Sequence, residues 1–238
     1  ISTFIRLGIQ EAGLAKCREC FTRARRPEEI AQRREEIVAA AATLLDDQPL
    51  DAISLNAIAR QVGLAKSAVY RYFESREAIF LKILERDWRD WMDEADYALI
   101  AFKGSNDVAG VAAALTGATV KQPRLCTLVS ALASVLERNL SEAAVLAFKQ
   151  DSLQLAMRLV NSLHAALPAI AAHRLVEFLN PALALIAGLW PLCHPSETVR
   201  KVMARPEFAP FQPDFEGQLQ RTLRTTLAGL VEESALAS

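Results

Sequence analysis

The sequence predicts an all-α protein. Apolar residues make up 52% of its 238 positions, which is enough for a sizeable core, and only nine residues are glycine. Alanine and leucine, which are both strong helix formers, are abundant. Apolar residues recur at intervals of three and four along most of the chain, whereas no segment has the alternating pattern of a half-buried strand. No internal repeat or low-complexity segment breaks this organisation.

The first helix is expected from Pro27 to about Leu45. Proline is favoured in the first turn of a helix, and the glutamates that follow it (Glu28, Glu29) interact well with the partial positive charge there. The Asp-Asp-Gln-Pro sequence at residues 46–49 ends the helix. Its apolar face consists of Ile30, Ile37, Val38, Ala41, Leu44 and Leu45.

Two short helices follow, separated by little more than one glycine. Ser54 is a good N-cap for a helix over residues 55–62, because its hydroxyl can accept a hydrogen bond from the first helical turn. Gly63 supplies the turn, and the second helix is expected over residues 66–72. A helix, a tight turn and a second helix form the arrangement of a helix-turn-helix.

A long helix is expected from Arg76 to about Phe102, with Ser75 as its cap and the sequence Gly-Ser-Asn at residues 104–106 as its end. Proline, serine and aspartate residues mark the boundaries of the helices beyond it. Pro181 should kink or interrupt one of them. These helices are expected near residues 107–120, 124–138, 141–166, 169–190, 196–204 and 214–233.

The second short helix has an unusual face for a chain whose formal net charge is −1. The side chains within one arc of roughly 140°, at about 100° per residue, are Lys66, Ser67, Tyr70 and Arg71. Residues 55–73 contain no acidic residue. Carboxylates would repel a DNA duplex, which carries one charge per about 1.7 Å. The face therefore predicts insertion into a DNA major groove, with a solvated helix face as the simpler alternative.

The segment ISLNAIARQVGLAKSAVYRYFESREAIFLKIL (residues 53–84) resembles the DNA-binding segment of the tetracycline-repressor (TetR) family of bacterial regulators. The matching features are Ile58-Ala59, Val62-Gly63, Lys66, Tyr70, Tyr72-Phe73 and the Ser-Arg-Glu-Ala sequence at residues 75–78. The resemblance implies a three-helix DNA-binding domain at residues 27–75. It also implies a larger helical ligand-binding and dimerisation domain at residues 76–238, joined through the helix at 76–102. A dimer of this kind would repress transcription at a palindromic operator until a ligand releases it.

The resemblance assigns DNA contacts to individual residues. Ser54, Tyr70 and Arg76 are expected to meet phosphate, and the remaining polar side chains to meet phosphate or base edges. Tyr72 and Phe73 are expected to be chiefly structural. The full set of expected DNA-contacting positions is Ser54, Lys66, Ser67, Ala68, Tyr70, Arg71 and Arg76.

Three positions depart from the family's pattern. Pro49 stands where the family commonly has glycine. Ala65 stands where serine or threonine often caps the second short helix, which forfeits about 1 kcal/mol of capping. Ala68 stands where threonine is frequent, so one polar contact to DNA is expected to be absent.

Residues 1–26 have no clear helical pattern. The basic run at residues 22–26 (TRARR) is typical of an arm that enters the minor groove, and the alternative is a disordered tail. Cys17 and Cys20 have zinc-like spacing, but no second pair of cysteines or histidines lies near them, and a structural zinc needs four ligands. Neither a metal nor a cofactor is expected.

The apolar helices of the second half predict a cavity for a hydrophobic ligand. Residues 107–120 and 124–136 are rich in alanine, valine and leucine, and residues 153–172 contain only Arg158 among formal charges. Complete packing of these side chains is the simpler alternative. The candidate pocket residues are Trp91, Phe102, Phe148, Met157, His164 and Trp190.

A homodimer is expected because one short recognition helix reads only a few base pairs, and specificity requires two about 34–36 Å apart. Leucines at helical spacing near the C-terminus and the uncharged helix around Ala182–Trp190 predict a four-helix interface. Both stripes could instead pack within one chain. The candidate interface residues are Leu185, Leu189, Leu219, Leu223, Leu227 and Leu230.

Other classes of protein fit less well. The three histidines are scattered and no phosphate-binding loop accompanies them, so catalysis is not expected. A DNA-binding organiser of chromosomes or cell division is the closer alternative. The 19 residues from Phe178 to Ser196 carry no formal charge, but prolines interrupt them, which favours a buried core helix over a membrane span. A cytoplasmic protein without a membrane segment is expected.

Overall fold

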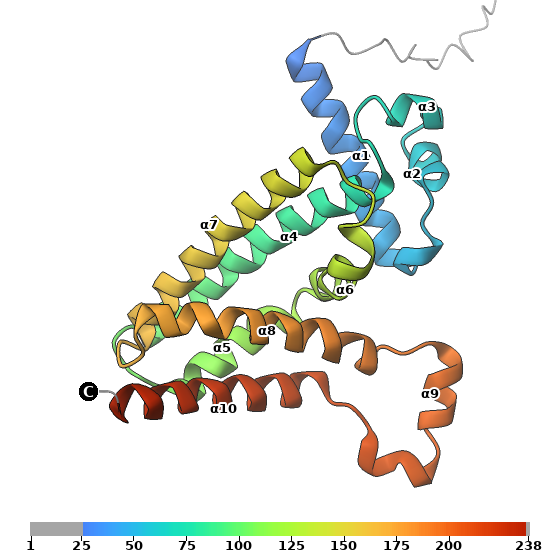
Figure 1. The fold of residues 1–238 in the computed structure, drawn as a ribbon. Coiled ribbons are helices and arrows are strands. Elements are labelled where there is room, and N and C mark those ends of the chain that lie inside the picture. Colours follow the sequence, from blue (N-terminus) through green and yellow to red (C-terminus); the bar gives the residue numbers. More distant parts are fainter. Residues whose placement is uncertain (1–25, 237–238) are drawn as a thin grey trace, which may run out of the picture.

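The structure, a computed structural model, describes residues 26–236 (Figure 1). Within this range the chain forms ten α-helices and no strand, which confirms the predicted all-α fold. The helices are α1 (Pro27–Asp47), α2 (Leu55–Gln61), α3 (Lys66–Val69), α4 (Arg76–Leu99), α5 (Val108–Val120), α6 (Pro123–Ala131), α7 (Glu142–Ala166), α8 (Ala172–Cys193), α9 (Glu197–Met203) and α10 (Phe215–Leu236). The shorter elements are the 3-10 helices η1 (Leu50–Ala52), η2 (Ile100–Phe102) and η4 (Pro206–Phe211) and the π-helical turn η3 (Leu132–Leu136).

The N-terminal domain consists of α1, α2 and α3 packed against the start of α4 (Figure 1). Ile37 from α1, Ile58 from α2 and Val69 from α3 have no exposed surface and meet in its core, together with Ile79 and Phe80 of α4. Each such side chain contributes about 1.5–3 kcal/mol by leaving water. The shared core fixes the two short helices, which would be too short to persist alone.

Three predicted helices end earlier than expected. α4 ends at Leu99 rather than at about Phe102, and the 3-10 helix η2 follows it. α3 stops at Val69 instead of residue 72, because the chain tightens into turns in which Tyr72 N–H donates to the carbonyl of Val69. The predicted helix at residues 124–138 divides into α6 and the π-helical turn η3. η4 was not predicted at all. These differences concern local hydrogen-bonding patterns that the spacing of apolar residues does not specify.

The C-terminal domain is a bundle in which α4 contacts α5, α6 and α7, while α8 contacts α6, α7 and α10. Figure 1 shows α4 and α7 running side by side, with α8 and α10 forming the opposite edge of the bundle. The segment that joins α8 to α10 carries α9 and η4 away from the bundle, and neither of these two helices contains a buried residue. This segment comprises residues 194–214.

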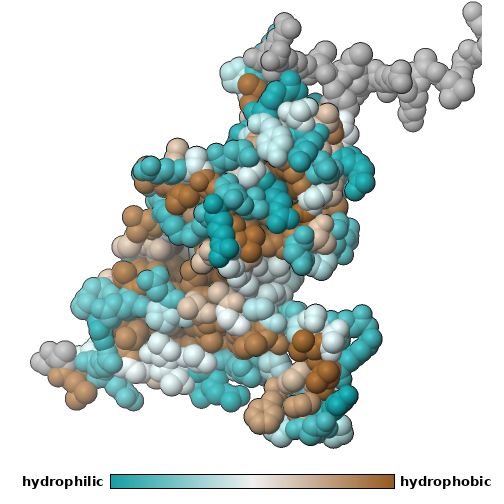
Figure 2. All heavy atoms as spheres, turned by 45° about the vertical axis from the view of Figure 1, so that its right-hand side comes forward, coloured by the Kyte–Doolittle hydropathy of each residue, from teal (hydrophilic) through white to brown (hydrophobic). Residues whose placement is uncertain are grey.

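α8 differs from its prediction in two respects. It continues through Pro181, because this proline lies on the exposed side, where solvent can replace the missing hydrogen bond. It is also not a buried core helix: only Leu175, Phe178 and Leu189 are buried, since α8 lies at the edge of a single bundle. Apolar side chains consequently gather on the surface of this part of the molecule (Figure 2).

α8 is also long and apolar enough to cross a membrane by length and composition alone, with a mean hydropathy of 1.6 over its most apolar window. Of that window 17% is buried in the structure. Its packing against α6, α7 and α10 makes it an edge helix of the C-terminal bundle.

Candidate nucleic-acid interface and effector cavity

The turn between α2 and α3 is built from three local features. The Ser54 hydroxyl accepts a hydrogen bond from Ala57 N–H at 3.2 Å, so it caps α2 as predicted. Gly63 has a φ of 66°, a conformation that residues with a Cβ rarely adopt. The backbone N–H of Leu64 then donates to the carbonyl of Ala59 at 2.8 Å, which closes the turn. α3 leaves this turn from Ala65, which provides no side-chain cap.

The structure brings the predicted DNA-facing side chains of α3 and of the turn directly after it together on one exposed surface. Lys66, Ser67 and Arg71 are exposed, and the Tyr70 side chain is 51% exposed. The Lys66 ammonium lies 5.8 Å from the centre of the Tyr70 ring. Behind this surface Val69 is completely buried, so α3 is anchored on one side and open on the other. We call Lys66, Ser67, Tyr70 and Arg71 the recognition face.

Arg76 has a different environment from the recognition face. Its Nη1 donates to the carbonyl of Ile53 at 2.7 Å, and its Nε lies 2.9 Å from a carboxylate oxygen of Glu77. These contacts fasten the start of α4 to the segment before α2. Ser54 is exposed beside them while its hydroxyl caps α2, and Ala68 is half-buried at the edge of α3.

A second arginine stabilises the chain after α3. The guanidinium of Arg34 in α1 donates to the carbonyl of Tyr72 and lies 4.4 Å above the centre of the Phe73 ring. Phe73 is buried and Tyr72 is half-buried, which fits the structural role expected for both. The recognition face is therefore held by contacts on either side of it.

The C-terminal domain contains an apolar cavity of about 410 Å³ between α4, α6, α7 and α8. Two of the predicted pocket residues, Trp91 and Phe148, lie in its wall. A cavity of this size accommodates a small organic molecule. Other wall residues are Trp88 and Met92 from α4, Leu115 and Thr119 from α5, Leu125, Cys126 and Val129 from α6, Ser152, Leu155, Ala156 and Leu159 from α7, and Asn180, Leu183 and Ile186 from α8.

The few polar groups of the cavity wall already have hydrogen-bond partners, with one exception. Thr119 accepts from Trp91 Nε1 at 3.1 Å and donates to the carbonyl of Leu115, and the Ser152 hydroxyl donates to the carbonyl of Phe148. Among residues 26–236, nothing hydrogen-bonds the side-chain amide of Asn180. Asn180 is exposed, so its amide lies at the solvent-accessible part of the wall, where it could orient a polar end of a ligand.

Cys126 forms part of the wall as a neutral thiol. Its side chain is fully buried, and burial raises its pKa to about 12. Desolvation penalises the charged thiolate and leaves the thiol unaffected. The wall near Cys126 therefore carries no formal charge at neutral pH.

The other four predicted pocket residues do not line this cavity. Phe102 packs beside Gly110 at the far end of α4, and Met157 is exposed on α7. His164 lies beyond it on α7 with its Nδ1 2.9 Å from the carbonyl oxygen of Ile170. Trp190 donates to the Thr127 hydroxyl and stacks on His194, the residue directly after α8. Aromatic or polar character alone thus did not identify the wall.

Most of the wall that the sequence missed consists of aliphatic residues of α6, α7 and α8. The only signal was their helical spacing, such as Leu155 and Leu159, which core residues share. Nothing in such spacing separates a side chain that borders a cavity from one that fills the core.

The predicted interface leucines are mostly internal. Leu189, Leu219, Leu223 and Leu227 are buried within the single chain, so they cannot form its outer surface. The reason is that the apolar stripe of α10 packs onto α5 and α8 of the same bundle. Leu185 and Leu230 are half-buried against the core. The exposed face of α8 instead contains Pro181, Ala184, Gly188 and Leu192.

The possible arm at residues 22–26 and the pair Cys17 and Cys20 fall within residues 1–25 or border them, and these predictions lie outside the described part of the chain. Within residues 26–236, no group of three or more His, Cys, Asp and Glu side chains is arranged to hold a metal ion.

Comparison with known proteins agrees with this geometry. The family model described as "Bacterial regulatory proteins, tetR family" matches residues 37–83, and the model described as "Tetracyclin repressor-like, C-terminal domain" matches residues 85–234. The HTH-type transcriptional regulator Rv1816 of Mycobacterium tuberculosis is 38% identical over 97 residues, which are 38% of this chain and 42% of that protein. The regulator EthR of the same species is 40% identical over 63 residues, which are 26% of this chain and 27% of EthR. The matched segments thus span less than half of either relative.

Solved structures share the fold over most of the chain. A possible TetR-family transcriptional regulator from Streptomyces coelicolor has a TM-score of 0.53 and 20% sequence identity, over 83% of this chain and 98% of that one. The fatty acid degradation regulator FadR from Bacillus halodurans has a TM-score of 0.52 and 15% identity, over 87% of this chain and 98% of that one. With family models matching both domains, the chain belongs to the TetR family, and it is a DNA-binding transcriptional regulator with an N-terminal helix-turn-helix domain and a C-terminal helical domain.

Proposed function

We propose that the protein is a cytoplasmic repressor that binds a palindromic operator as a homodimer and leaves it when an apolar small molecule fills the cavity. The observation that carries this proposal is the combination, in one chain, of an acid-free recognition face on α3 and an apolar cavity beside α4. α4 connects the two, because it begins next to the recognition face and its residues Trp88, Trp91 and Met92 line the cavity.

Binding to DNA would use the recognition face for both affinity and specificity. Lys66 and Arg71 are charged, exposed and free of nearby carboxylates on α3, so they can contact phosphate or the acceptor atoms of guanine in the major groove. Ser67 and Tyr70 add hydroxyl groups beside them. Arg76 is already tied to Ile53 and Glu77, so we assign it to positioning α4 as well as to phosphate.

The exposed face of α8 supports a dimer better than the inward leucines do. Ala184 and Gly188 are small and exposed, and a Cβ added at Gly188 would meet no atom within 4 Å. Small residues allow two helices to approach closely across a twofold axis. An uncharged face of this kind is more stable against a second copy than against water.

The ligand is expected to be largely apolar and uncharged. The wall is almost entirely hydrocarbon, its Cys126 thiol is neutral, and the Lys149 ammonium at its edge is already paired with Glu137. A buried charge on the ligand would lack a counter-ion there. One hydrogen-bonding group, placed near Asn180, completes the expected pattern.

Selection from a pool of random duplexes, followed by sequencing, tests the DNA-binding part of this proposal. A repressor dimer should select two inverted half-sites about one helical turn apart. Replacing Lys66 and Arg71 together by alanine should abolish the selection. The variant Arg200→Ala/Lys201→Ala on α9 removes the same charge at a distance and should retain it. Selection of no sequence by the wild-type protein would favour the alternative of a general DNA organiser.

Two further measurements test the dimer and the ligand. Light scattering should show a dimer at micromolar concentration, and Gly188→Arg should convert it to a folded monomer.

The neutral fluorescent probe N-phenyl-1-naphthylamine should bind the cavity and release the selected DNA. The substitution Ala156→Trp would fill part of the cavity and should prevent probe binding, whereas Ala143→Trp on the exposed face of α7 should not. A monomeric wild-type protein would contradict the proposed homodimer. A bound probe that leaves the DNA complex intact would contradict the proposed release by a ligand.

A further inference from the structure

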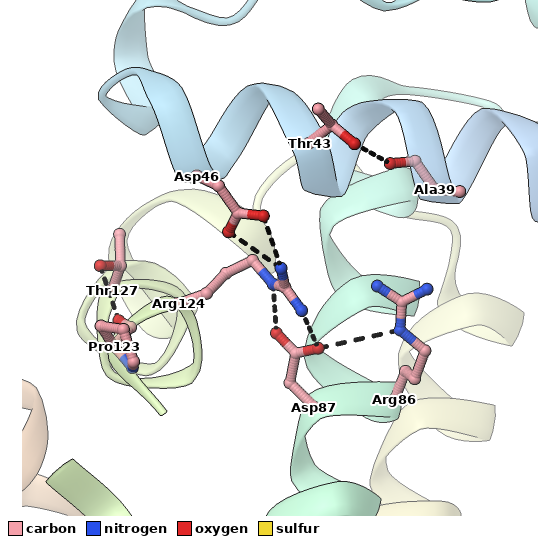
Figure 3. A network of polar contacts seen from close by, with 8 residues as sticks. All are labelled: Ala39, Thr43, Asp46, Arg86, Asp87, Pro123, Arg124 and Thr127. Carbon is pink, nitrogen blue, oxygen red and sulfur yellow. Dashed lines mark hydrogen bonds and ion pairs between the residues drawn. The ribbon is translucent and has the colours of Figure 1, made fainter. Parts of the chain in front are cut away.

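One arginine joins three helices and both domains. Arg124, near the start of α6, donates from Nε and Nη2 to the two carboxylate oxygens of Asp87 in α4 at 2.7 and 2.8 Å. Its Nη1 lies 2.9 and 3.1 Å from the carboxylate oxygens of Asp46, at the end of α1. Figure 3 shows the guanidinium between the two carboxylates, with α1 on one side and α4 on the other. Asp46 belongs to the N-terminal domain, and Arg124 belongs to the C-terminal bundle.

The two halves of this network differ in burial. The Asp87 side chain is 1% exposed, whereas the Asp46 side chain is 55% exposed. A buried carboxylate without a partner is costly, and Arg86 approaches Asp87 only to 3.8 Å, so Arg124 and Asp87 must stay paired. Hydrogen bonds to Asp87 raise the pKa of Arg124, which keeps the guanidinium charged. The contact to Asp46, in contrast, can open to solvent.

The residues next to this network face the cavity. Trp88 follows Asp87 in α4, and Leu125 and Cys126 follow Arg124 in α6, and all three lie in the cavity wall. α6 also ends in the π-helical turn η3, whose Leu132 lies in the same wall. Such turns are frequent at functional sites. Anything that enlarges or fills the cavity therefore acts on the helix that carries Arg124.

We propose that the Arg124–Asp46 ion pair is an interdomain clamp that holds the N-terminal domain in its operator-binding orientation and opens when a ligand displaces α6. This inference rests on the proposed ligand-responsive DNA binding. It adds a residue pair through which the cavity and the recognition face are coupled. Opening the clamp shifts the population from the operator-binding to the ligand-binding conformation, so it must weaken operator binding and strengthen ligand binding.

The decisive variant is Asp46→Asn, which opens the clamp and leaves Arg124 paired with Asp87. Operator affinity should fall roughly threefold to tenfold, the range expected from one partly exposed ion pair in each of two protomers. The affinity for N-phenyl-1-naphthylamine should rise, because more of the free protein occupies the ligand-binding conformation. Removing a negative charge favours DNA binding by itself, so a loss of affinity would have to come from the clamp.

A second variant opens the clamp with a different change of charge. Arg124→Gln combined with Asp87→Asn leaves the net charge unchanged and leaves no buried carboxylate unpaired. It should shift both affinities in the same directions as Asp46→Asn. The conservative variant Asp46→Glu keeps the ion pair within reach and should restore operator affinity towards that of the wild type.

Arg158 supplies the matched control, because it too is held by two aspartates. It bridges Asp93 and Asp96, and both lie in α4 within the C-terminal domain. Asp93→Asn therefore removes one exposed carboxylate from an arginine without touching a link between domains. Its operator and probe affinities should equal those of the wild type.

The outcomes separate this inference from the proposed function. If the wild-type protein selects no operator, the proposed function fails. If the wild type binds the operator and probe but Asp46→Asn changes neither affinity, the clamp is refuted while the function stands. A loss of operator affinity that Asp93→Asn reproduces, or that occurs without tighter probe binding, also overturns the clamp, because it would reflect general destabilisation.

Discussion

The two domains of this protein use the same secondary structure for opposite purposes. In the N-terminal domain, α1, α2 and α3 surround a filled core in which Ile37, Ile58 and Val69 have no exposed surface. In the C-terminal domain, the helices enclose about 410 Å³ that protein atoms leave open. Under the proposed function this difference has a reason, because reading a DNA sequence requires side chains held in fixed positions, whereas accepting a ligand requires space. Helix packing is complete around the core of the proposed reading domain and incomplete around the proposed ligand site.

The largest expected effect concerns the thiol in the cavity wall. Because burial raises the pKa of Cys126 to about 12, its thiolate fraction near pH 8 should be about three orders of magnitude below that of a free cysteine. Alkylation of Cys126 by iodoacetamide should therefore be slower by about that factor in the folded protein than in the denatured chain. Its rate should keep increasing with pH well above 8.5. Mass spectrometry of a variant with Cys17 and Cys20 replaced by serine measures the rate.

An equally fast reaction of Cys126 in folded and denatured protein would show that the cavity is open to water at this wall. The half-buried Cys193 at the end of α8 is the internal comparison. Its pKa is also raised by burial, but its partial exposure should make it the faster of the two thiols.

The second effect compares matched truncations in the two domains. Ile58→Ala in the filled core should lower the free energy of unfolding by about 2–5 kcal/mol, because it creates a new cavity. Ile186→Ala removes the same atoms from a half-buried position beside an existing cavity and should cost clearly less. Urea denaturation followed by circular dichroism measures both. Equal losses would mean that the C-terminal domain is as tightly packed as the N-terminal one.

The third effect concerns the contribution of Lys66 to operator binding by the N-terminal domain. Lys66→Ala should weaken operator binding by about 1–3 kcal/mol and relax the preference at one base pair if Lys66 reads a base. If Lys66 meets only phosphate, all sequences should lose affinity alike, and the salt dependence should decrease by about one ion. Fluorescence anisotropy with the selected operator and a series of base-pair substitutions distinguishes the two. Unchanged affinity would remove Lys66 from the interface.

The comparison between the domains also explains what the sequence could predict. The turn and the exposed side chains around α3 could be predicted, since a cap at Ser54, a glycine at position 63 and the absence of acidic residues are each local features. The contact of these side chains with DNA stays a prediction. The cavity was predicted as a possibility, but only Trp91 and Phe148 of its wall were identified. A cavity results from the distances between helices far apart in sequence, and periodic leucines give no information about those distances.

The leucines of α10 illustrate the same limit in another form. Their spacing correctly predicted an apolar stripe, but a stripe does not name the surface against which it packs. Leu219 and Leu227 are fully buried against their own chain, so they are not available for an interface. The proposed interface therefore lies on the small exposed residues of α8. The contact between Asp46 and Arg124 was not predicted, because 78 positions separate the two residues and no local pattern connects them.

The smallest expected effect lies at the start of α3. α2 and α4 are capped by Ser54 and Ser75, whereas Ala65 offers no side chain to cap α3. Ala65→Ser should stabilise the N-terminal domain by about 0.5–1 kcal/mol, and Ser75→Ala should destabilise it by about 1 kcal/mol. Hydrogen exchange of the α3 amides detects the first change. Unaltered protection in Ala65→Ser would show that the turn before α3, rather than the missing cap, limits its stability.

The length of α4 has a mechanical consequence. Its 24 residues form a rod about 36 Å long at a rise of about 1.5 Å per residue. The cavity does not lie at the end of this rod, because Trp91, which lines it, is 16 residues beyond Ser75. A rotation of about 5° at Trp91 therefore moves the Ser75 end by about 2 Å, which is comparable with the distance between hydrogen and acceptor in a hydrogen bond. Under the proposed function, a ligand would need to cause only a small rotation beside the cavity for α3 to lose its register on DNA, because the rod converts an angle into a distance.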